Sequence, residues 1–106
     1  MTVPPSFNWN AWIDVMPGSK PTLYVTGEVQ TGAANLVPVL TEAVPQGINP
    51  AILLLDLTIV QQGVGIQLVA FRPARFEKAA KQGQYSHVEI RFGGELVAYE
   101  RVQTIH

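Results

Sequence analysis

The most apolar part of the chain is the segment 51–60, AILLLDLTIV, and the rest of the predicted fold is arranged around it. It begins as an unbroken apolar run and then alternates, with Leu55, Leu57 and Ile59 on one side. A proline precedes it and a Gln-Gln-Gly sequence follows it, so it is short for a helix and predicts a strand buried on at least one face. Burying a leucine contributes about 2 kcal/mol. We therefore expect this strand to form the centre of the core.

Further segments alternate between apolar and polar residues and are expected to form strands. They are 7–16, 22–31, 36–44, 64–71, 86–92 and 96–104. In the first, the side expected to face inward consists of Phe7, Trp9, Ala11, Ile13 and Val15. Pro38 cannot donate a backbone hydrogen bond, which predicts that 36–44 lies at a sheet edge. Gly27 falls on the inward side of 22–31, where it indicates a bulge or a close packing partner.

The C-terminal part has the composition of a hairpin, because Gly93-Gly94 separates two alternating segments. A two-residue turn at these glycines fixes which residues lie opposite one another. The expected pairs are Ile90 with Val97, Val88 with Tyr99, Arg91 with Leu96, Glu89 with Ala98 and His87 with Glu100.

The only helical signal lies in 73–82, where good helix formers stand between Pro73 and Gly83 and Glu77 precedes Lys81 by one helical turn. We expect one or two helical turns that link two strands. The alternative is that 71–76 continues the preceding strand.

About seven short strands, one short helical link and a proline-bearing edge predict an all-β fold, specifically an antiparallel β-sandwich. The immunoglobulin-like version is the most natural, since Tyr85 after Gly83 resembles the tyrosine corner of that fold. Tyr85 nevertheless shares its side of the strand with polar residues. The expected organisation is an N-terminal arm, 1–6, followed by a single domain, 7–106.

Charged residues make up 14% of the sequence, compared with about 25% in a typical soluble protein. A surface with so little charge has weak electrostatic protection against self-association. We therefore expect a homo-oligomer, with a dimer favoured. The alternative is a monomeric domain with an adhesive surface.

The composition also limits which metal sites, partners and cofactors are expected. The chain has no cysteine and a net charge of −1, so thiolate metal sites are absent and a nucleic-acid partner, which needs a clustered basic surface, is not expected. No segment is apolar enough to span a membrane, and the N-terminus has no signal-peptide pattern. A cytoplasmic location fits these features, although a trimmed exported protein would look the same. No cofactor motif or catalytic serine motif is present, and no cofactor is expected.

Three polar sets are candidates for chemistry. His87, Glu89 and Glu100 would share one sheet face and could bind a metal or a ligand, although such cross-strand pairs are common on solvated surfaces. Asp14 and Asp56 lie in apolar strands and could act as acid or base if buried; the simpler interpretation is that both face solvent.

The third set, Arg72 and Arg75, forms with Lys78 the most basic local sequence and could bind an anion. The alternative for these residues is a solvated loop.

Trp12, Met16 and Tyr24 lie on the predicted outward sides of the first two strands. If they are adjacent, they form an apolar patch with a polar, uncharged rim, which is the composition of an interface. The leading hypothesis is therefore a non-catalytic interaction module that self-associates or binds a protein through a sheet face or edge. The alternatives are a small ligand- or metal-binding domain, possibly an enzyme, and a module that binds through the loop 45–50.

Overall fold

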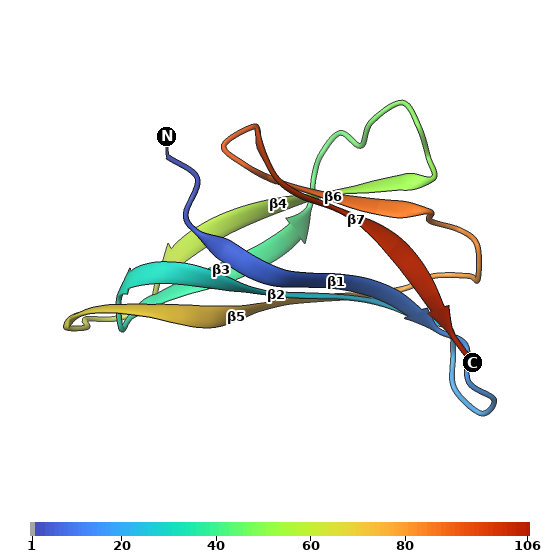
Figure 1. The fold of residues 1–106 in the computed structure, drawn as a ribbon, viewed down its shortest axis with the longest axis horizontal. Helices are drawn as coiled ribbons and strands as arrows, with labels where there is room; N and C mark the ends of the chain where they lie inside the picture. Colours follow the sequence, from blue (N-terminus) through green and yellow to red (C-terminus); the bar gives the residue numbers. More distant parts are fainter. Residues whose placement is uncertain (1) are drawn as a thin grey trace.

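The computed structural model describes residues 2–106, and these residues form seven strands and no helix. The strands are β1 (Ser6–Asp14), β2 (Thr22–Ala33), β3 (Leu36–Glu42), β4 (Ile52–Gln61), β5 (Gln67–Ala79), β6 (His87–Phe92) and β7 (Glu95–Ile105). They form one sheet in the order β3-β4-β6-β7-β1-β2-β5 (Figure 1). The predicted all-β fold is confirmed, as is the edge position of β3.

The sheet folds over on itself into a barrel-like shape that is nearly closed. β7 makes this possible, since its first part pairs with β6 and its last part, from Val102 to Ile105, pairs with β1. In Figure 1, β7 accordingly passes from the layer of β4 and β6 to the layer of β1, β2 and β5. The core lies between these two layers.

The sheet is mixed, so the prediction of a wholly antiparallel arrangement is wrong. β1 pairs with β7 and β4 pairs with β6 in parallel, whereas the other pairs are antiparallel. Parallel neighbours need long connections, and local alternation in the sequence does not report which distant strand becomes a neighbour. The immunoglobulin-like sandwich is therefore not confirmed.

The predicted helical link over 73–82 is also wrong, because residues 73–79 belong to β5. The alternative, that the preceding strand continues, is the one observed. β5 pairs with β2 from Thr31↔Ala70 to Thr22↔Ala79, and Ala74 is buried in the core. A helix this short is marginal by itself, so the long ladder with β2 outweighs its helix propensity.

The core is built from both layers and is centred on β4, as predicted. Leu53, Leu55 and Leu57 are almost completely buried, whereas Ile59 is half-buried. Their buried partners are Ala11, Ile13, Leu23, Val25, Val29, Leu40, Ala74, Ala80, Val88 and Ile90. The alternating apolar positions of the sequence thus meet in one cluster.

A β-bulge near the start of β1 changes the expected inward face of this strand. The register with β2 shifts between Phe7 and Asn10, and Asn8 has a positive φ of 56°, which asparagine tolerates better than most residues. Phe7 therefore lies opposite Glu28 and packs on Phe71, with ring centroids 4.7 Å apart. The prediction that Phe7 faces inward is wrong.

A second bulge changes the C-terminal hairpin. The pairs Phe92↔Glu95 and Arg91↔Leu96 follow from the Gly93-Gly94 turn, but the register then shifts by one residue. Beyond the shift the pairs are Ile90↔Ala98, Glu89↔Tyr99, Val88↔Glu100 and His87↔Arg101. The predicted pairs Ile90–Val97, Val88–Tyr99, Glu89–Ala98 and His87–Glu100 are therefore wrong, because an extra residue in one strand of a bulge re-aims every residue after it.

Side chains rather than a ladder connect the two edge strands, β3 and β5. Lys78 Nζ lies 3.0 Å from Glu42 Oε1 and donates a hydrogen bond of 3.0 Å to the Tyr85 hydroxyl. Arg72 Nη1 donates to the carbonyl oxygen of Ala34 at 3.1 Å. These contacts hold the near-closed seam of the sheet, and Tyr85 bonds to a lysine side chain here.

The seam should show a characteristic pH dependence. The hydrogen bonds to Tyr85 and then to Glu42 raise the pKa of Lys78 above its ordinary value of 10.5. The stabilisation is therefore fully present below the unfolded-state pKa and is lost as pH rises through the higher folded-state pKa. We expect Lys78→Met to lower the free energy of unfolding by about 1 kcal/mol or less near neutral pH. The difference from wild type should shrink above about pH 10.5 in urea titrations, and a pH-independent difference would contradict this assignment.

Candidate functional site

The three residues proposed for metal or ligand binding on one sheet face do not come together. Glu100 lies opposite Val88 rather than His87, as a result of the bulge in β7. The His87 ring stacks on Tyr99 with centroids 4.8 Å apart, and Glu89 forms an ion pair with Arg91. Within residues 2–106, no group of three histidine, cysteine, aspartate or glutamate side chains is placed to hold a metal ion.

The other charged candidates are each engaged or separate. Asp14 Oδ1 accepts a hydrogen bond of 2.9 Å from the backbone N–H of Met16, which caps the end of β1. Asp56 is half-buried opposite Arg91, in a different part of the sheet. The two carboxylates therefore do not face a common cavity.

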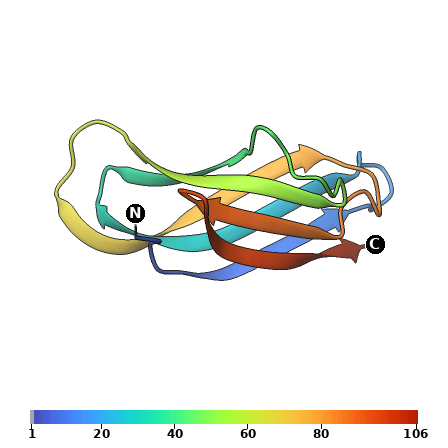
Figure 2. The same cartoon turned by 90° about the horizontal axis from the view of Figure 1, so that it is seen from above.

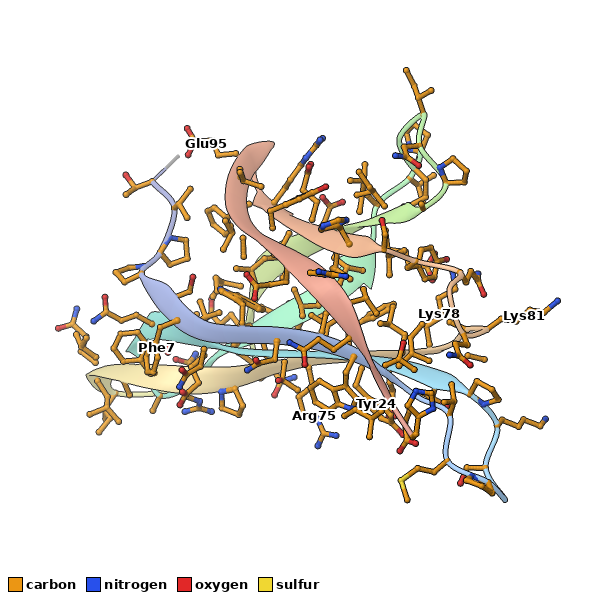
Figure 3. The ribbon with its side chains drawn as sticks, turned by 45° about the vertical axis from the view of Figure 1, so that its right-hand side comes forward. Phe7, Tyr24, Arg75, Lys78, Lys81 and Glu95 are labelled. Carbon is orange, nitrogen blue, oxygen red and sulfur yellow. The ribbon has the colours of Figure 1, made fainter. Side chains whose placement is uncertain are left out.

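Arg72 and Arg75 point to different sides of β5. Arg72 lies opposite the buried Val29, whereas Arg75 lies opposite Thr26 and is exposed. Figure 3 shows Arg75 and Tyr24 on the lower side of the molecule. Since Arg72 also donates to a backbone carbonyl at the seam, the two guanidinium groups do not converge on one anion.

The loop 45–50 is anchored to β4 through Gln46. The Gln46 side-chain Nε2 donates to the Leu54 carbonyl oxygen at 2.9 Å, and the Leu54 N–H donates to Gln46 Oε1 at 2.8 Å. The Gln46 side-chain amide thus forms the two hydrogen bonds with Leu54 that the backbone of a paired strand residue would form. Ile48 in this loop is fully exposed.

The aromatic candidates, in contrast, are adjacent as the hypothesis requires. Trp12 and Tyr24 are cross-strand partners, and their rings stack with centroids 5.5 Å apart and an interplanar angle of 23°. Both are half-buried, and Met16 lies exposed beyond the end of β1. Next to Trp12, a hollow of about 300 Å³ opens between β1 and β7.

A second feature, which the sequence pattern did not predict, is an exposed apolar connection between the two layers at one end of the molecule. We call residues 60–71, the loop from β4 to β5 and the strand ends beside it, the β4–β5 tip; β4 and β5 are not neighbours in the sheet. Its exposed large apolar side chains are Val60, Val64, Ile66, Leu68, Val69 and Phe71. Figure 2 shows the turn projecting beyond the rest of the sheet, and Figure 3 places Phe7, which packs on Phe71, at the opposite end from Lys81.

A signal for the β4–β5 tip is present in the sequence. No charged residue occurs from Leu57 to Phe71, and apolar residues occupy both parities of the segment 64–71. A strand that is apolar on both faces must be covered on both faces or remain partly exposed. Val69 and Phe71 form the second apolar face, beside the one that contains Ile66 and Leu68.

Comparisons with known proteins do not assign the chain to a family. No family model, no curated protein and no solved structure matches the chain. Among the residues that the structure describes, there is no helix of the length and apolarity that a membrane span requires. The features that could serve a function are therefore the β4–β5 tip, the Trp12–Tyr24 pair and the hollow beside this pair.

Proposed function

We propose that this protein is a non-catalytic interaction domain that self-associates as a dimer, with the β4–β5 tip as its contact surface. The observation that carries the proposal is the group of exposed apolar side chains on this uncharged connection. Val64 is fully exposed and Ile66 is 74% exposed. Isolated exposed apolar residues are ordinary, but a contiguous group of large ones is characteristic of interaction sites.

The energetics support association through this surface. Full burial of one such side chain contributes about 1.5–3 kcal/mol, and a micromolar dissociation constant corresponds to about 8 kcal/mol. The six apolar side chains of the β4–β5 tip are 40–100% exposed, so burial of their remaining accessible surface would give about 6–11 kcal/mol, a gross gain of the same order as this value before the entropic cost of association is counted.

A second copy of the chain is the best-supported occupant. The tip has no charge and the whole chain has a net charge of only −1, so like surfaces meet without electrostatic repulsion. A two-fold contact places the same patch of both copies together, which closes the assembly at a dimer.

Association through the sheet edges is less favourable than association through the tip. β3 contains Pro38 and β5 contains Pro73, and a proline cannot donate to an added strand. The seam formed by Lys78 and Glu42 further occupies the space beside both edges.

Size-exclusion chromatography with light scattering at micromolar concentration tests the proposal. We expect wild type to be a dimer and Val64→Glu/Val69→Glu to be a monomer with an unchanged circular dichroism spectrum. The matched control is Val44→Glu/Ile48→Glu, which places the same charges at two almost fully exposed apolar positions outside the tip, and it should remain dimeric.

The same experiment distinguishes two candidate dimer contacts, the β4–β5 tip and the face of Trp12 and Tyr24. Dissociation by Trp12→Glu but not by the tip variant would move the interface to the face of Trp12 and Tyr24. A wild-type monomer at every accessible concentration would overturn the proposal of self-association.

A further inference from the structure

The hollow beside Trp12 exists because β1 and β7 diverge. They pair only from Ala11↔Val102 to Asp14↔Ile105. Before this stretch, β1 pairs with β2 alone and β7 pairs with β6. The space of about 300 Å³ at the fork is lined by Asn10, Trp12, Glu100, Arg101, Gln103 and Ile105, among others. None of these residues belongs to the β4–β5 tip, so the site is independent of the proposed dimer contact.

The apolar wall of the hollow is the Trp12 side chain, held in place from behind. Tyr24 of β2 stacks on Trp12 at 5.5 Å and does not line the hollow, whereas Gln103 of β7, the partner of Trp12 on its other side, does. The hollow is therefore on the β7 side of the indole. A tryptophan fixed in this way offers an apolar surface at little entropic cost.

The polar wall of the hollow is available to a ligand. Within residues 2–106, the side chains of Glu100, Arg101 and Gln103 take part in no hydrogen bond or ion pair. Arg101 and Gln103 are two residues apart in β7 and therefore lie on the same face, where they supply a guanidinium that donates and an amide that both donates and accepts. Glu100 is adjacent to Arg101 in the strand, so its side chain lies on the opposite face. Asn10 adds a second neutral amide to the lining.

We infer that this hollow binds a saccharide, with one sugar ring lying against Trp12. A sugar ring presents an apolar C–H face to an aromatic surface and carries hydroxyl groups, each a donor and an acceptor, around its edge. That combination matches an indole wall surrounded by Asn10, Arg101 and Gln103. The volume is at the lower limit of ligand sites, about 300 Å³, and suits one or two rings.

The structure assigns separate roles to the two aromatic residues. Trp12 contacts the ligand, whereas Tyr24 is a positioning residue that holds the indole. Trp12→Leu should therefore weaken binding about tenfold or more, and Tyr24→Leu should weaken it less. Gln103→Ala should weaken binding with retention of the fold.

Two-dimensional NMR titration of the full chain tests the inference. The probes are the trisaccharides maltotriose, cellotriose, mannotriose and N,N′,N″-triacetylchitotriose, with adenosine and uridine as flat aromatic competitors. We expect at least one trisaccharide to shift the Trp12 indole and Gln103 amide signals in a saturable way. Phe71→Ala, which removes an exposed aromatic side chain of β5 that does not line the hollow, should leave the affinity unchanged.

Each remaining outcome counts against the inference. The absence of saturable shifts with every saccharide would overturn it. Saccharide binding that persists in a folded Trp12→Leu variant would place the site elsewhere. Nucleoside binding at the hollow in preference to the saccharides would replace the ligand class, and the spectra of the unbound variants report whether each one is folded.

Discussion

Replacement of Leu55 by alanine is expected to lower the free energy of unfolding by about 2–5 kcal/mol. Leu55 is completely buried in the middle of β4. It lies between Glu42 of β3 and Ile90 of β6 in the sheet. The substitution removes buried apolar area and leaves a cavity that neighbours on both sides cannot fill without moving their strands. Since small domains have a net stability of about 5–15 kcal/mol, the variant should be close to unfolding.

Urea denaturation followed by tryptophan fluorescence measures this loss. Leu96→Ala is the matched control, because Leu96 is a strand leucine that is 60% exposed, and its substitution should change the free energy of unfolding by less than about 1 kcal/mol. Equal losses in the two variants would mean that β4 does not form the centre of the core.

Gly27→Ala is expected to lower the free energy of unfolding by about 1–3 kcal/mol. A Cβ atom at position 27 would lie 2.2 Å from Cε3 of the Trp9 ring, far inside a van der Waals contact. Trp9 is held over Gly27 by the bulge in β1 and by a hydrogen bond of 2.9 Å from its Nε1 to Ser6 Oγ. The ring must therefore move, and β1 moves with it.

Gly32→Ala is the control for this substitution. Gly32 lies in the same strand, but an added Cβ there meets no atom within 4 Å. In the background Trp9→Leu, the cost of Gly27→Ala should become smaller, because the clashing ring is gone. A cost that is equal with and without Trp9 would show that the backbone, rather than the ring, requires glycine at this position.

The sequence correctly predicted those structural features that depend on a single strand or a single residue. The central strand, the burial of Leu53, Leu55 and Leu57, and the edge position of Pro38 were predicted, and the close partner of Gly27 is present as Trp9. Each depends on the period of one strand or on a property of one residue.

The candidate site was predicted only in part. The neighbourhood of Trp12 and Tyr24 was anticipated, because two adjacent strands carried aromatic residues on the same side. The set of His87, Glu89 and Glu100 was assembled on a register that the bulge in β7 changes. Glu100 lies instead at the hollow beside Trp12.

The amino-acid sequence by itself determined that this chain forms strands, that Leu53, Leu55 and Leu57 enter the core, and that few residues carry charge. Only the tertiary structure decided the parallel pairing of β1 with β7 and of β4 with β6, the loss of the predicted helix to β5, and the position of both bulges. The physical reason is that strand formation follows from alternation within a few residues. Strand partners and register depend instead on contacts between segments far apart in the chain. These contacts form only when the whole sheet folds, so the alternation within one strand does not specify them.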